Sequence, residues 1–335
     1  MKLFSRLLVA PAALGLMAPV AANADTAFSS TTTLSGSAVF TVGSVADGGT
    51  SDTEEELYMQ YAYGLDINSS FTGEDLLSAG IVTGNASGPL ASMDSAEEGT
   101  GALTVSSLFY SFPVGDLAVT AGPLVDQDDV VAATTSAYSD AFRLGSMPYS
   151  LAGGETGPGV GVAYSNDNGV VASVSFVSVG GSDSTVGIGA DDGDDVSTFT
   201  LGYDGDGFGG GLVIATNDGE AGEGYDTFGG GIYYSPESVP ATISVAYDTT
   251  DPETGADATD LFVGVDYEVG PGTLSAAYNS TDIDGSDSED STGFEVSYSY
   301  GLNDYVSVTA GFFTVEDTST GDDDTGVVAE TYFSF

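Results

Sequence analysis

The chain has 335 residues, of which 41% are hydrophobic and 10% aromatic, so it has enough apolar material to fold. It contains 51 Asp and Glu against 3 Lys and Arg, a formal net charge of −48, which excludes nucleic acid and anionic membrane surfaces as partners. The sequence has no Cys and no His, which excludes disulfide scaffolds, imidazole and thiolate metal sites, and His-based catalytic triads. A carboxylate pair is the main catalytic option left, and it is a weak signal because so many acids form pairs by chance. We therefore predict no enzyme and no cofactor.

The N-terminus has the pattern of an export signal. Lys2 and Arg6 precede an apolar run over 7–21, and Ala22-Asn-Ala24 is a small-x-small cleavage site. The run is too short and too interrupted by proline to span a membrane as a helix. We predict a signal peptide over 1–24, and the remaining chain keeps all 51 acids and a single base, Arg143.

After the signal, stretches of about ten residues alternate in hydrophobicity, as β-strands do when one face is apolar. In 258–269, for example, apolar residues at odd positions alternate with Asp266 and Glu268. The pattern predicts sixteen strands, at about 33–42, 56–68, 75–83, 102–112, 116–122, 159–166, 169–179, 195–204, 207–216, 225–235, 239–248, 258–269, 272–280, 292–301, 304–315 and 325–335. The signal is weakest at 75–83 and 116–122.

The connections alternate between short turns and long acidic loops. The short ones are rich in Gly, Asn and Pro, as tight hairpins require; examples are 113–115, 204–207 and 270–272. The long ones carry acid clusters, as in 183–194 and 317–324. Outer-membrane barrels place short turns in the periplasm and long loops outside. We predict an all-β fold, a transmembrane antiparallel barrel of about 16 strands with 14 or 18 as alternatives, occupying 25–335.

The chain ends on an aromatic residue with no polar tail. Phe333 and Phe335 share one face of the last predicted strand and Glu330 lies on the other. Closing a barrel requires a last strand that pairs with the first. We predict this pairing, and we interpret Phe333 and Phe335 as the signal read by the barrel-assembly machinery.

Some acids lie in phase opposite to the apolar face of their strands. They are Asp66, Asp266, Glu268, Glu295 and Glu330. A carboxylate facing lipid is costly, so their phase indicates water on that side. The functional interpretation is a negative lumen that favours cations; the alternative is a β-sandwich with a solvated face.

The longest connection, at about 123–158, follows the fifth predicted strand. In sixteen-stranded porins the loop in that place folds inward and narrows the pore, so we predict a constriction loop. Its charged residues are Asp126, Asp128, Asp129, Asp140, Arg143 and Glu155. Arg143 facing the acids would set a transverse field, and a plain structural ion pair is an equal alternative.

Two further patterns have modest interpretations. The acidic clusters at 189–195 and 321–324 match no calcium motif; solvated loops are preferred, and loose Ca²⁺ binding is the alternative. Gly209-Gly-Gly211 and Gly229-Gly-Gly231 lie inside strands without a following helix. We expect them to relieve crowding or to bend the wall.

Several stretches resemble a known family. Marine cyanobacterial outer-membrane porins have segments similar to several in this chain. These segments are the leader, Ser70-Phe-Thr-Gly-Glu-Asp-Leu-Leu77, Ser107-Leu-Phe-Tyr-Ser-Phe-Pro-Val-Gly115 with Val119-Thr-Ala-Gly122, and Gln127-Asp-Asp129 with Ser136-Ala-Tyr138. These porins are related to the carbohydrate-selective and iron-uptake porins. Two departures stand out: the strands begin without the surface-layer-homology domain usual in such porins, and Glu74 and Asp126 replace bases.

Together these observations predict an outer-membrane porin, a passive diffusion channel for small hydrophilic solutes, with sugars, inorganic ions and iron left open as cargo. Its expected partners are outer-membrane lipid, the assembly machinery and, as an option, two further copies in a homotrimer. The expected location is the outer membrane of a Gram-negative-type cell, a marine cyanobacterium by resemblance. The rivals are a non-conducting acidic surface protein or adhesin, and an outer-membrane barrel enzyme.

Overall fold

The computed structural model describes residues 31–46, 56–139, 142, 155–190, 193–219, 224–285, 290–317 and 322–335. The predicted signal peptide, Asp140 and Arg143 lie outside these residues. Within the described chain there is no helix long and apolar enough to cross a membrane.

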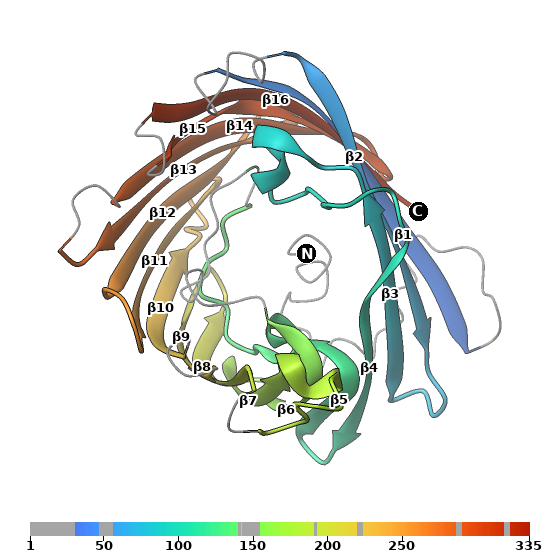
Figure 1. Ribbon diagram of the computed structural model, residues 1–335. Helices are drawn as coiled ribbons and strands as arrows, with labels where there is room; N and C mark the ends of the chain where they lie inside the picture. The colour runs from blue at the N-terminus through green and yellow to red at the C-terminus, as the bar shows by residue number, and fades with distance from the viewer. Residues whose placement is uncertain are drawn as a thin grey trace.

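The fold is one closed antiparallel barrel, seen nearly end-on in Figure 1. Its strands are β1 (Thr32–Ala46), β2 (Tyr58–Ser69), β3 (Leu76–Gly84), β4 (Thr104–Val114), β5 (Leu117–Asp126), β6 (Thr156–Ser165), β7 (Val170–Ser178), β8 (Asp195–Gly205), β9 (Phe208–Asp218), β10 (Tyr225–Tyr234), β11 (Ala241–Pro252), β12 (Ala258–Val269), β13 (Gly272–Ile283), β14 (Ser291–Asn303), β15 (Val306–Asp317) and β16 (Asp322–Ser334). Each strand pairs with its sequence neighbours, and β1 pairs with β16. The prediction of sixteen strands is confirmed, including the two weakest ones, β3 and β5.

The last strand closes the ring. In the register between β1 and β16, Ala38 lies opposite Phe333. The backbones of Gly36 and Phe335 exchange two hydrogen bonds of 2.8 and 3.0 Å, so the ladder continues to the final residue. The Phe335 ring packs over Gly36, where a Cβ atom would lie 2.7 Å from it. The predicted pairing of the first and last strands is therefore confirmed.

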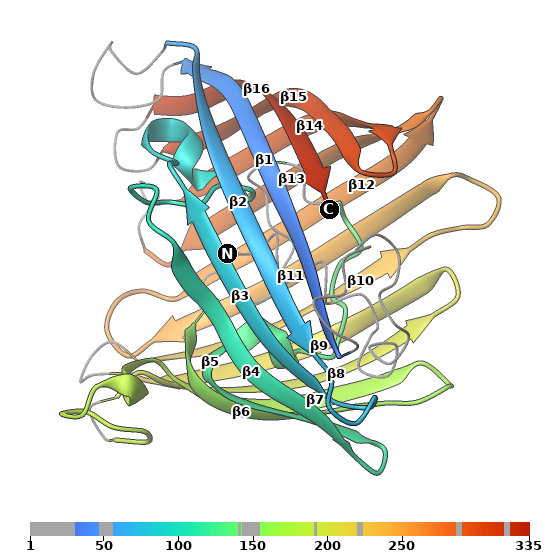
Figure 2. The ribbon, with the colours of Figure 1, turned by 90° about the vertical axis from the view of Figure 1, so that its right-hand side faces the viewer.

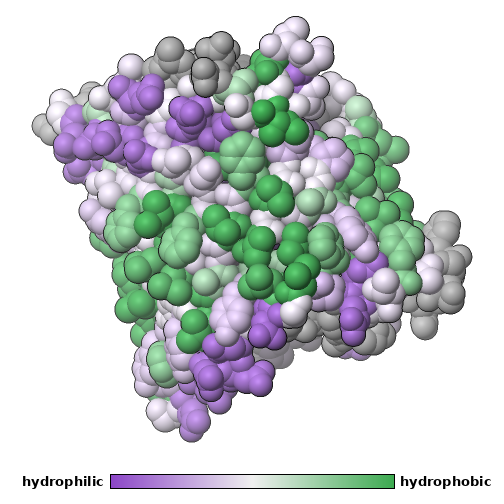
Figure 3. Space-filling model, turned by 90° about the horizontal axis from the view of Figure 1, so that it is seen from below, coloured by the Kyte–Doolittle hydropathy of each residue, from purple (hydrophilic) through white to green (hydrophobic). Residues whose placement is uncertain are grey.

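The two faces of the wall differ as the alternation predicts. On β12, Leu261, Val263 and Val265 are exposed on the outside, whereas the intervening Phe262 is buried. Seen from the side in Figure 3, apolar surface covers much of the middle of the barrel, with polar patches toward its edges. An outer apolar band of this kind is what lipid contact requires.

The two ends of the barrel carry different connections, and the strands run obliquely between them (Figure 2). The end that holds the C-terminus has short turns, of which five contain a glycine with positive φ: Gly73 (87°), Gly115 (65°), Gly169 (83°), Gly207 (78°) and Gly270 (63°). Glycine adopts this conformation without the steric cost that other residues meet. The opposite end carries the long connections, three of which include a short 3₁₀ helix: η2 (Gly88–Ser92), η3 (Gln127–Val130) and η4 (Val179–Ser182).

Candidate functional site in the barrel lumen

The connection between β5 and β6 folds into the barrel. It begins with the 3₁₀ helix η3 (Gln127–Val130) and continues as an extended chain along the inner wall, visible inside the ring in Figure 1. We call residues 127–139 the inner segment. Its course explains why several wall positions that the sequence leaves unexplained are occupied by small residues.

The root of the inner segment is fixed by a capping box. The Asp126 side chain accepts a hydrogen bond from the Asp128 backbone N–H (3.0 Å), and the Asp129 carboxylate accepts one from the Asp126 N–H (2.9 Å). The hydroxyl of Thr156 on β6 donates to Asp126 (2.7 Å). The Gln127 N–H donates to the Glu155 carbonyl (2.9 Å). Asp126 and Asp129 therefore hold the loop in place, as caps of a helix N-terminus do.

Negative charge is crowded at this root. Burial raises the pKa of Asp129 to about 7, and the neighbouring carboxylates Asp126 and Asp128 act in the same direction. Burial also raises the pKa of Glu155, with smaller contributions from Asp194 and Asp126. In both cases the cause is loss of water around a carboxylate and proximity of like charge. These groups therefore hold protons more readily than ordinary surface acids.

A track of glycines lets the inner segment approach the wall. An added Cβ would lie 2.2 Å from Val130 at Gly161 on β6, and 2.9 and 2.6 Å from Ala133 at Gly202 on β8 and Gly211 on β9. At Gly231 on β10 it would lie 2.1 Å from the carbonyl oxygen of Thr135, and at Gly264 on β12 it would lie 2.6 Å from the Tyr138 ring. The expectation that the Gly-Gly-Gly stretches relieve crowding is confirmed at Gly211 and Gly231. We call these five glycines the glycine track.

Hydrogen bonds fasten the inner segment to successive strands. Gln127 donates to Thr198 on β8 (2.7 Å), and the backbone N–H groups of Ala132 and Ala137 donate to Ser173 on β7 (3.1 Å) and Ser244 on β11 (3.0 Å). The segment is thus held by polar wall side chains along its length. Backbone groups in a buried connection need such partners, because unpaired polar groups are costly away from water.

Tyr138 and Ser139 bind the predicted lumen acids directly. The Tyr138 hydroxyl donates to Glu295 on β14 (2.7 Å), and the Ser139 N–H donates to Asp266 on β12 (2.9 Å). Ser275 also donates to Asp266 (2.5 Å). Hydrogen bonds to a carboxylate are stronger than those between neutral groups. Sequence reasoning missed this role of Tyr138, because no local pattern links it to a strand that lies so much later in the chain.

A second segment folds inward beside the first. Glu330 on β16 accepts hydrogen bonds from Thr41 on β1 (2.9 Å) and from Ser95 in the β3–β4 connection. Gln60 on β2 donates to the carbonyl of Leu90 in η2 (2.8 Å). These bonds hold η2 against the inside of the wall near the closing strands.

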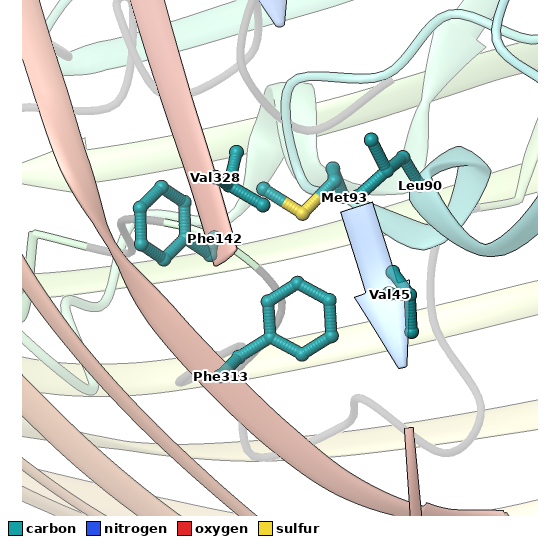
Figure 4. Packing of buried hydrophobic residues seen from close by; sticks show 6 residues of the cluster. All are labelled: Val45, Leu90, Met93, Phe142, Phe313 and Val328. Carbon is teal, nitrogen blue, oxygen red and sulfur yellow. The ribbon is translucent and has the colours of Figure 1, made fainter. Parts of the chain in front are cut away.

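Phe142, which follows the inner segment in the β5–β6 connection, meets the second inward segment in an apolar cluster. Figure 4 shows the six side chains of this cluster close together: Phe142, Phe313, Met93, Leu90, Val45 and Val328. The Asp94 N–H also donates to the Phe142 carbonyl (2.5 Å). Phe142 and Phe313 are fully buried, so the barrel has an internal core although its lumen is a channel. Phe142 therefore fastens the β5–β6 connection to the β3–β4 connection.

The five predicted lumen acids have different surroundings. Glu295 is fully buried and Glu330 is 8% exposed, whereas Asp66 and Asp266 are half-buried and Glu268 is exposed. Of the predicted constriction residues, Asp128 is buried while Asp126, Asp129 and Glu155 are half-buried. Asp140 and Arg143 lie outside the described residues.

Known structures share this architecture. The chain matches an OprB structure from Pseudomonas putida at high pH with a TM-score of 0.68 and 10% identity, covering 91% of this chain and 94% of that one. It also matches two mutant porins from Rh. blastica, with TM-scores of 0.59 and 0.61, each at 16% identity over 91% of this chain and 100% of the other. At these identities the likeness shows a shared fold.

Sequence comparison assigns the family. A search of curated proteins returned no significant match. The family model described as Gram-negative porin matches residues 10–332, nearly the whole chain. With the closed sixteen-stranded barrel and its inward-folded connection, this match shows that the chain belongs to the Gram-negative porin family of outer-membrane diffusion channels.

Proposed function

We propose that this porin is a passive pore whose negative lumen favours cations over anions, with no chemical step. One observation supports this above all: the described residues contain no Lys, Arg or His, while acids such as Asp266 and Glu268 lie on the inner side of the wall by register. Their charges therefore have no basic side chain beside them in the described wall. Rings of acids in a channel attract cations and repel anions.

The constriction assignment is part of this proposal. The inner segment lies inside the barrel, and Asp126, Asp128 and Asp129 lie close together at its root. We propose that Asp126, Asp128, Asp129 and Glu155 contribute to the field there, together with Asp140 and Arg143. Glu295 and Glu330 are fully or nearly buried, so we expect their contribution to be smaller than that of Asp266 and Glu268.

Reversal potentials in planar bilayers under a KCl gradient test the proposal. We expect the sign that indicates preference for K⁺, and we expect the double substitution Asp266→Asn with Glu268→Gln to move the potential toward zero. Glu237→Gln, in the short β10–β11 turn, is the matched control and leaves the potential unchanged. Anion preference in the wild-type channel would overturn the proposed selectivity. Failure to conduct at all would instead favour the adhesin-like alternative.

The remaining expectations are proposals of the same kind. We propose that Phe333 and Phe335 direct insertion by the barrel-assembly machinery, that the barrel assembles as a homotrimer in outer-membrane lipid, and that residues 1–24 are removed as a signal peptide. Native mass measurement in detergent tests the trimer. Liposome swelling with neutral sugars, compared with cation flux, separates sugars from inorganic ions and iron as cargo. A marine cyanobacterial origin rests on the resemblance alone.

A further inference from the structure

An acidic cavity lies at the rim of the barrel, at the long-loop end of β8 to β11. Its volume is about 600 Å³, and the acids that line it are Asp195, Asp218, Asp226, Asp251 and Glu253. Asp195 and Asp218 lie opposite each other on the outer face of β8 and β9. Further from the rim, the same face carries the pair Ser197 and Thr216, and then the pair Phe199 and Ile214. Phe199 and Ile214 are both about half exposed, as lipid-facing residues are. The cavity therefore sits just above the apolar band.

Two pairs of like charges face each other across neighbouring strands in this cavity. Asp195 on β8 lies directly opposite Asp218 on β9, and Asp226 on β10 lies directly opposite Asp251 on β11. Side chains in such positions have Cβ atoms about 4.5–5.5 Å apart, and like charges there destabilise the sheet. No basic side chain of the described residues lies beside these pairs, and a cation from solution would compensate their charge.

One buried oxygen in the cavity points to a ligand. Asp195 is only 7% exposed and lines the cavity. Among the described residues, its Oδ1 has no hydrogen-bond partner. A buried unpaired carboxylate oxygen is costly unless it is paired with a positive charge or coordinates a metal. The crowding of charge and the unpartnered oxygen of the buried Asp195 are both relieved by a single cation.

We propose that this cavity binds a hard divalent cation, with Ca²⁺ preferred over Mg²⁺. Calcium binds oxygen ligands at about 2.3–2.6 Å, so two oxygens on opposite sides of one ion are about 5 Å apart. Carboxylates of a cross-strand pair, whose Cβ atoms are about 4.5–5.5 Å apart, can reach one ion between them. No three acidic side chains of the described residues converge into a metal site by themselves. Water therefore completes the shell, which the flexible coordination of Ca²⁺ allows and the strict octahedron of Mg²⁺ disfavours.

Calorimetric titration with Ca²⁺ alone tests the site, using the full barrel folded in an uncharged detergent. We expect a dissociation constant of about 0.1–1 mM, as in other extracellular sites of low affinity. Asp195→Asn should weaken binding about tenfold, because it removes the buried carboxylate ligand. Asp206→Asn is the matched control: it makes the same charge change in the turn at the other end of the β8–β9 hairpin. It should leave the affinity unchanged.

A second measurement uses Tyr225, which also lines the cavity. Tb³⁺ bound there should emit on excitation through tyrosine, Tyr225→Phe should lower the emission, and Ca²⁺ should displace it. Asp218→Asn, at the exposed partner of Asp195, replaces Asp195→Asn if the latter does not fold. The proposal is overturned if the wild type takes up no Ca²⁺ at millimolar concentration. It is equally overturned if Asp206→Asn weakens binding as much as the cavity substitutions, because the acids would then act only as a diffuse field.

Discussion

The glycine track predicts a loss of conductance and stability that a second substitution should reverse. In Gly211→Ala the new Cβ would lie 2.6 Å from the Cβ of Ala133, whereas carbon atoms in contact are about 3.5–4.0 Å apart. The wall is fixed by ladder bonds on both sides, so the inner segment has to move about 1 Å toward the lumen. Overpacking of this size lowers the free energy of unfolding by about 1–3 kcal/mol. We expect lower single-channel conductance and a lower midpoint of unfolding.

The rescue distinguishes this contact from a general effect of mutation. Ala133→Gly removes the clashing atom, so the double variant with Gly211→Ala should recover wild-type conductance. Gly231→Ala should show the same loss without rescue by Ala133→Gly, because its Cβ would lie 2.1 Å from the Thr135 carbonyl oxygen. Gly301→Ala is the control, since nothing lies within 4 Å of its added Cβ. Wild-type conductance in Gly211→Ala, or failure of the double variant to recover, would refute the reasoning.

Three further predictions follow from the hydrogen bonds and pKa shifts. Because burial raises the pKa of Asp129 from 3.8 to about 7, the folded protein takes up a proton that the unfolded chain does not, so stability should rise as the pH falls from about 8 to 5. Asp129→Asn should flatten that rise in denaturant titrations. Tyr138→Phe removes the hydroxyl that donates to the buried Glu295 carboxylate, so it should lower the free energy of unfolding by about 1.5–3 kcal/mol and increase the current noise of the channel. Tyr300→Phe, on the outer face, should change neither quantity. Hydrogen bonds from the Tyr110 hydroxyl, and from Ser70 and Thr72, lower the pKa of Asp75. The ionised Asp75 therefore stabilises the folded protein above the ordinary pKa of Asp, and this stabilisation is lost as the pH falls below that value. Asp75→Asn should abolish that acid-dependent loss of thermal stability, whereas Glu74→Gln should retain it.

The wall could be predicted from the sequence because its information is local. A period of two residues places Asp266 and Glu268 opposite Val265 and Tyr267 without reference to any partner strand. The turns are local in the same way, since a glycine such as Gly207 marks where the chain must adopt positive φ. The same reasoning predicts at which end of the barrel each loop lies, once the direction of the last strand is known.

The course of the inner segment could not be predicted in this way. Tyr138 meets Glu295 across 157 residues, and Ser95 meets Glu330 across 235. Phase alone shows that Glu295 and Glu330 face inward, but it does not show that another segment covers them. Gly231 and Gly264 carried a partial signal, since a glycine within a strand marks either a bend or a close approach of other backbone. The sequence does not say which segment approaches.

The closing contact between β1 and β16 has a consequence for how the barrel forms. Thr41 and Glu330 are hydrogen-bonded although 289 residues separate them, and the ladder ends only at the last residue, Phe335. Contacts of such long sequence separation form slowly, because the entropy of a very large loop must be overcome first. Until β16 has been made and has paired, β1 has no partner for one of its edges, and free edges recruit other chains. The unfinished chain must therefore be shielded during its passage to the membrane, and removal of even a few C-terminal residues should convert a stable ring into an aggregating sheet.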